Sequence, residues 1–111
     1  MFVIIQYSKG NILFYLRNRK QEPINSRVVT ISKKNYKQSL LRNIYNLLSQ
    51  TNNKVKDLDF LLLKMNDFKS LEVDAVYEVS SYLKMQLHKN IIVTNNIETF
   101  KYKEYLKRKE R

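Results

Sequence analysis

Residues 36–71 read YKQSLLRNIYNLLSQTNNKVKDLDFLLLKMNDFKSL and contain two different apolar patterns. In the first part, leucine and isoleucine recur at the spacing of one helix face, which predicts an amphipathic helix over residues 35–49. In the second part, FLLL at 60–63 is too short for a core helix and is typical of a strand covered on both faces. A helix that leads into such a strand, expected over 57–65, predicts a layered α/β architecture. The apolar helix positions are Leu40, Ile44, Leu47 and Leu48.

The segments on either side of this unit complete the domain. Before it, β-branched and alternating runs predict three antiparallel strands, and after it we expect a second helix and a further strand. These five segments lie at 2–7, 12–17, 26–31, 67–87 and 91–93. The sequence therefore predicts one α/β domain over residues 1–96, of order βββαβαβ, followed by a basic C-terminal helix or tail at 97–111. This is the element order of the ribonuclease H-like fold, which also forms one lobe of the actin-like ATPases.

The composition narrows the class of protein. The chain has 111 residues, no cysteine and a formal net charge of +11. Without cysteine it can form neither a disulfide nor a thiolate metal site. Its apolar runs fall short of the roughly 18 residues of a membrane span, and the opening MFVII lacks the features of a signal peptide. We therefore expect a cytoplasmic protein with no membrane partner.

The positive charge is concentrated in the first half of the chain. Glu22 is the only acidic residue before position 57, against eleven lysines and arginines. Such a surface can bind polyanions, because lysine and arginine displace counterions from phosphates. A solvated face, or the lysine-rich composition that an AT-rich genome dictates, explains the same numbers. The candidate nucleic-acid contacts are Arg17, Arg19, Lys20, Arg27, Lys33, Lys34 and Lys37.

The residue types that catalysis needs are sparse. A two-metal nuclease requires clustered carboxylates, for which Asp57, Asp59 and Asp67 are the candidates. A single glycine cannot make the phosphate loops of an ATPase. His88 ends the second predicted helix, where its charge would complement the helix dipole. We therefore expect no catalytic residue, no metal and no cofactor, with a divergent nuclease as the least favoured alternative.

The helix, loop and strand of residues 36–63 also carry a family resemblance. The helix fits H-S-x-x-L-L-x-x-I-x-x-L-L from Tyr36 to Leu48, and Asp57 to Asp59 match a D-L-D that precedes a hydrophobic strand. Both motifs resemble the TsaB (YeaZ) family. The likeness covers residues 1 to about 100 and corresponds to the N-terminal lobe of that family. Its glycine-rich turn is shortened here to 65–72, and its second lobe has no counterpart in this sequence.

The resemblance implies a scaffold rather than an enzyme. TsaB is the inactive actin-like partner in bacterial synthesis of the threonylcarbamoyl-adenosine modification of tRNA. Its family pairs with the catalytic subunit TsaD, or with itself, through the two helices of this lobe. The alternative function is a small basic nucleic-acid-binding module of the same fold, whose basic face would bind tRNA. The residues implied for the partner interface are Leu41, Tyr45, Leu48, Val76, Leu83 and Leu87.

Overall fold

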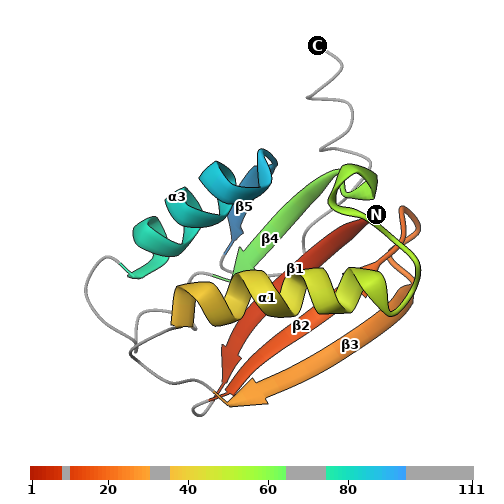
Figure 1. The fold of residues 1–111 in the computed structure, drawn as a ribbon, viewed down its shortest axis with the longest axis horizontal. Helices are drawn as coiled ribbons and strands as arrows, with labels where there is room; N and C mark the ends of the chain where they lie inside the picture. Colours follow the sequence, from red (N-terminus) through yellow and green to blue (C-terminus); the bar gives the residue numbers. More distant parts are fainter. Residues whose placement is uncertain (9–10, 31–35, 65–74, 95–111) are drawn as a thin grey trace.

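The computed structural model describes residues 1–8, 11–30, 36–64 and 75–94, which form one sheet with two helices (Figure 1). The elements are β1 (Phe2–Ser8), β2 (Asn11–Arg17), β3 (Pro23–Thr30), α1 (Tyr36–Ser49), the 3-10 helix η1 (Val55–Asp57), β4 (Phe60–Lys64), α3 (Ala75–Leu87) and β5 (Asn90–Thr94). Strands and helices follow the predicted order. The predicted tail at 97–111 lies outside the described residues. Neither described helix is long and apolar enough to cross a bilayer.

The strands form a mixed sheet in the order β3-β2-β1-β4-β5. The first three strands pair antiparallel, with Val3 opposite Leu16 and Phe14 opposite Arg27. β4 pairs parallel with both β1 and β5. Antiparallel neighbours can be joined by short turns, whereas parallel neighbours need long crossovers, and α1 and α3 lie in the two long connections. β3 and β5 are therefore the edge strands, and β1 and β4 lie inside the sheet.

Both helices cover the same face of the sheet (Figure 1). Leu40 and Ile44 of α1 and Val79 of α3 belong to one buried cluster with alternate residues of β1, β2 and β4. The alternation follows the pleat, which points successive side chains to opposite faces. Burial of each such side chain stabilises the fold by about 1.5–3 kcal/mol. The strand residues of this cluster are Val3, Ile5, Ile12, Phe14, Leu16, Leu61 and Leu63.

The inner strands are buried on their other face as well. Phe2 and Ile4 of β1 form a second buried cluster with Phe60 and Leu62 of β4. The rings of Phe2 and Phe60 stack with their centroids 4.9 Å apart. All four residues from Phe60 to Leu63 are 0% exposed. This confirms the prediction that FLLL forms a strand covered on both faces.

The structure moves the starts of β3 and β4 by three residues from their predicted positions. β4 begins at Phe60 rather than at 57, because Asp57 ends η1 and its Oδ2 accepts a hydrogen bond from the backbone N–H of Lys54 at 2.8 Å. β3 begins at Pro23 rather than at 26, so the strand is longer at its start than the sequence predicts. The first part of the predicted second helix, residues 67–74, lies outside the described residues.

Candidate partner-binding surface

α1 has one flank toward the edge of the sheet and another toward α3. Asn43 marks the first flank, since its Oδ1 accepts a hydrogen bond from Nε of Arg27 in β3 at 2.9 Å. Successive helix residues are rotated by about 100°, so Lys37, Leu41 and Tyr45 share the opposite flank at four-residue spacing. That flank faces α3, which lies beside α1 on the same face of the sheet (Figure 1).

An ion pair between the first turns of the helices fixes which flanks face each other. Nζ of Lys37 lies 3.3 Å from Oε2 of Glu78 in α3, and the two side chains are 38% and 56% exposed. A pair this exposed contributes little net stability. It does place Glu78 beside the start of α1, and Tyr82 and Met85 follow Glu78 along α3 at helical spacing.

Four large side chains on the outer sides of the two helices, Leu41 and Tyr45 of α1 with Tyr82 and Met85 of α3, are named here the two-helix surface. Tyr45 is 47% exposed and Met85 is 70% exposed. Leu41 and Tyr82 are half-buried and pack against the core beneath them. Tyrosine offers a large apolar ring with a polar tip, and methionine adapts its shape, so both are enriched at protein interfaces. The two-helix surface therefore has the chemistry of a protein-binding surface on a rigid base.

Only part of the interface implied by the sequence lies at this surface. Leu48, Leu83 and Leu87 are 1%, 0% and 4% exposed and belong to the core between the helices and the sheet. A partner cannot reach them while the helices keep this packing, so these leucines are core residues. Val76 lies in α3, but its side chain is outside the described ones. Leu41 and Tyr45 remain the predicted contacts.

Sequence reasoning missed two residues of this surface. Met85 lies off the apolar stripe of α3 that Val79, Leu83 and Leu87 form, and an apolar residue outside its stripe is the signal that could have identified it. Tyr82 flanks the stripe in the sequence. Only the contact between the helices shows that its side of α3 faces α1.

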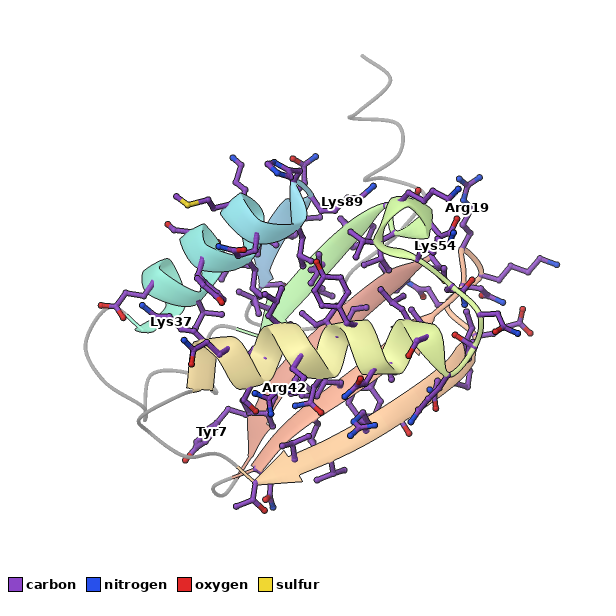
Figure 2. All side chains as sticks on the ribbon, viewed as in Figure 1. Tyr7, Arg19, Lys37, Arg42, Lys54 and Lys89 are labelled. Atoms are coloured by element: carbon purple, nitrogen blue, oxygen red, sulfur yellow. The ribbon has the colours of Figure 1, made fainter. Side chains whose placement is uncertain are left out.

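The described cations proposed as nucleic-acid contacts do not share one surface. Arg19 and Lys20 lie in the turn between β2 and β3, and Arg17 closes β2 beside that turn. Lys37 lies at the opposite end of the molecule from Arg19 (Figure 2). The predicted group is therefore divided between two ends of the sheet.

At least three of these cations have polar partners within the chain, and the first is Arg19, which pairs with Asp59. Arg27 donates to Asn43, and Lys37 pairs with Glu78. Both contacts join a helix to a neighbouring element. Lys33 and Lys34 lie outside the described residues.

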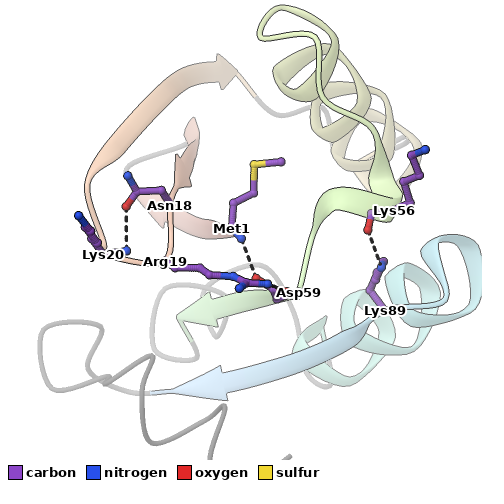
Figure 3. Close-up of polar contacts among 7 residues, drawn as sticks. All are labelled: Met1, Asn18, Arg19, Lys20, Lys56, Asp59 and Lys89. Atoms are coloured by element: carbon purple, nitrogen blue, oxygen red, sulfur yellow. Dashed lines mark hydrogen bonds and ion pairs between the residues drawn. The ribbon is translucent and has the colours of Figure 1, made fainter.

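The carboxylates considered for metal-dependent cleavage have structural partners. Oδ2 of Asp59 lies 2.6 Å from the α-amino group of Met1, and its Oδ1 lies 3.6 Å from Nη2 of Arg19 (Figure 3). Asp57 and Asp59 both precede β4, whereas ligand sites of open α/β sheets lie beyond the carboxyl ends of the strands. Asp67 lies outside the described residues. These contacts indicate that Asp57 and Asp59 stabilise the fold.

A metal-binding cluster or an unpartnered buried polar atom within residues 1–8, 11–30, 36–64 and 75–94 would also mark a small-ligand site. Those ranges contain no group of three or more His, Asp or Glu residues placed to hold a metal ion, and no buried side-chain nitrogen or oxygen without a hydrogen-bond partner. His88 is exposed, with φ of 54°, and its N–H donates to the carbonyl of Lys84 at 2.9 Å. This is the left-handed residue that ends a helix.

Comparison with known proteins concerns the fold. No protein family and no curated protein matches the sequence. Among solved structures, YeaZ from Pseudomonas aeruginosa is similar, with a TM-score of 0.57 and 14% sequence identity. The match covers 86% of this chain and 43% of that chain, so this chain spans less than half the length of YeaZ. The five-stranded sheet with two helices is consistent with a YeaZ-like, ribonuclease H-like fold.

Proposed function

We propose that this chain is a non-catalytic scaffold subunit that binds a partner protein through the two-helix surface. The observation that carries the proposal is the exposure of Tyr45 and Met85 on adjacent helices, at 47% and 70%. Exposed large apolar side chains on rigid elements are typical of protein interaction sites. The half-buried Leu41 and Tyr82 anchor this surface to the core, so its shape is set before a partner arrives.

The class of partner comes from the TsaB resemblance. It is a TsaD-type catalytic subunit, or a second copy of this chain, and the process supported is the threonylcarbamoyl-adenosine modification of tRNA. The fold likeness to YeaZ supports a scaffold of this type. Two helices from each partner would pack side chains of one pair into grooves of the other, as in a four-helix bundle.

Size-exclusion chromatography with light scattering tests the proposal, on the protein alone and mixed with the TsaD-type protein of its source organism. A dimer or a one-to-one complex is expected for the wild type. The double variant Tyr45→Ala/Met85→Ala should weaken that assembly about thirtyfold or more, because two interface contacts of at least about 1 kcal/mol each are lost.

Val28→Ala is the matched control. Val28 is 66% exposed, and the alternation of β3 places it on the face away from Arg27 and α1. It should leave the assembly unchanged. A complex that survives the double substitution, or that Val28→Ala weakens equally, would show that the partner binds elsewhere. A monomer that does not bind the TsaD-type protein would reject the scaffold function.

The nucleic-acid-binding alternative requires a different site from the one that the sequence predicted. The described cations chosen from the sequence are divided between two ends of the sheet, and Arg27 and Lys37 are engaged within the chain. A partly different group of cations, which keeps Arg19 and Lys20, supports nucleic-acid binding. It lies at the end of the sheet where β1 and β4 begin.

A further inference from the structure

Five cationic residues from three connecting segments gather at the end of the sheet where β1, β4 and β5 begin. Arg19 and Lys20 come from the β2–β3 turn, Lys54 and Lys56 from η1 and its approach, and Lys89 from the residue before β5. Figure 2 shows Arg19, Lys54 and Lys89 on this side of the molecule, away from the start of α1. These five residues are named the cationic end.

Polar contacts hold the three segments together. Nη2 of Arg19 lies 3.6 Å from Oδ1 of Asp59, the residue before β4. Nζ of Lys89 lies 3.5 Å from the carbonyl oxygen of Lys56 (Figure 3). The segments are distant in the sequence, so only the fold brings these cations to one place. Their backbones are already positioned, which reduces the entropy lost when a ligand binds.

The β2–β3 turn that carries Arg19 and Lys20 is closed by its own hydrogen bonds. Oδ1 of Asn18 accepts from the N–H of Lys20 at 2.9 Å and from the N–H of Glu22 at 3.0 Å. Gln21 adopts φ of 63°, and its N–H donates to the carbonyl of Asn18 at 2.9 Å. The turn therefore has a defined shape from which its two cationic side chains project.

The carboxylates at this end are engaged in local contacts. Asp59 pairs with the α-amino group of Met1 as well as with Arg19, and Asp57 accepts from a backbone N–H. Glu22 accepts from Nδ2 of Asn18 at 3.2 Å. Within the described part of the chain, no carboxylate lies within 4.0 Å of the ammonium groups at positions 20, 54 and 56. The potential that this end presents to solvent is therefore positive.

We propose that the cationic end binds the phosphodiester backbone of a nucleic acid. Lysine ammonium groups act as point charges on phosphates, and each phosphate neutralised releases counterions without reading sequence. The cations lie on three separate segments, which suits an extended polyanion more than a single small anion. The proposal uses different residues from the two-helix surface and does not rest on partner binding.

A membrane surface fits this end less well. Interfacial membrane sites combine cations with Trp, Phe or Leu side chains that enter the lipid. The three segments read NRKQE at 18–22, NNKVKD at 52–57 and HK at 88–89, and none contains such a residue. The cationic end is therefore suited to an anion that is dissolved in water, such as a nucleic acid.

Fluorescence anisotropy with two labelled probes, an unmodified tRNA transcript and a DNA duplex, tests the proposal across a salt series. The test variant is Lys20→Gln/Lys56→Gln, and the matched control is Arg42→Gln/Lys84→Gln, which removes the same charge from exposed positions on α1 and α3. The slope of log affinity against log salt should fall by about 1.4–1.8 in the test variant, since each phosphate contact contributes about 0.7–0.9. Affinity at about 0.1 M salt should fall roughly tenfold or more. The control should lose much less of both.

The outcomes separate the explanations. Binding of the tRNA alone would identify RNA as the source of the phosphodiester, and binding of both probes would identify any duplex backbone; either supports the proposal. Equal losses in the two variants would assign binding to net charge alone and overturn it. The proposal would also be overturned if neither nucleic acid binds at about 0.15 M salt, or if the protein binds anionic vesicles but neither nucleic acid. The test variant should keep the wild-type melting temperature and partner complex, so failure of this site is distinguishable from failure of the scaffold function.

Discussion

The hydrogen bond between Arg27 of β3 and Asn43 of α1 tests how the helix layer is attached to the edge of the sheet. Asn43 is 6% exposed and is the one buried polar side chain in the described part of the chain. Its Oδ1 accepts from Nε of Arg27 at 2.9 Å, and its Nδ2 donates to the carbonyl of Ser39 at 2.7 Å. The sequence predicted Arg27 as a nucleic-acid contact. The structure instead leads us to expect that its substitution reduces the free energy of unfolding.

Either single substitution leaves half of this contact without its partner. In Arg27→Ala the buried Oδ1 of Asn43 loses its donor, and in Asn43→Ala the half-buried Nε of Arg27 loses its acceptor. Hydrogen bonds to charged groups contribute about 1.5–3 kcal/mol, and partial exposure of Arg27 favours the lower value of about 1.5 kcal/mol. At about 4 °C per kcal/mol for a domain of this size, each variant should melt about 6 °C below the wild type.

A double-mutant cycle in urea isolates the pair. Unfolding of the wild type, both single variants and the double variant should give a coupling energy of about 1 kcal/mol. Arg42→Ala, which removes an exposed arginine from the same helix, should change stability by less than about 0.5 kcal/mol. Additive single effects would refute the inference that this bond attaches α1 to β3. An Arg27→Ala variant with unchanged stability and weaker RNA binding would restore the assignment made from the sequence.

Two further substitutions test the packing and the end of α3. Leu83→Ala should reduce the free energy of unfolding, measured in urea, by about 2–5 kcal/mol, because Leu83 is 0% exposed. Met85→Ala should change it by less than about 0.5 kcal/mol, because Met85 is 70% exposed. Similar losses in the two variants would contradict the orientation of α3. His88→Gly should raise the free energy of unfolding by about 0.5–1 kcal/mol, because relief of the left-handed conformation exceeds the entropic cost of glycine. A lower melting temperature for His88→Gly would show that the imidazole makes a stabilising contact.

The parts of the fold that the sequence could predict are those governed by local periodicity. The helix expected over 35–49 is described over Tyr36–Ser49, and the FLLL run is a strand buried on both faces. One of the contacts at the start of β4 could not be predicted, because Asp59 lies before the strand and pairs with an amino group 58 residues away in the sequence. A contact of that separation leaves no local pattern.

The residues of the two-helix surface could likewise be predicted only in part from the sequence. A helical wheel groups Leu41 with Leu48, which follows it by seven residues on the same flank. In the structure Leu48 is buried in a cluster that also includes Leu58 and the partly buried Val55 of the connection between α1 and β4, and Leu41 remains half-buried. The loop that covers one end of a helix flank is a tertiary feature. Periodicity could therefore identify the flank but not which of its residues a partner can reach.

The two proposed surfaces differ in charge, and this difference gives each its own response to salt. The ion pair at the edge of the two-helix surface, Lys37 with Glu78, has no net charge. The four side chains that define the surface include no lysine, arginine, aspartate or glutamate. Burial of apolar area is only weakly screened by ions, whereas counterion release weakens phosphate binding steeply as salt rises. With a net charge of +11, two copies of this chain repel each other least where they meet through a neutral surface. Raising salt should therefore release nucleic acid from the cationic end while a partner stays on the helices, which allows one molecule to use both surfaces at once.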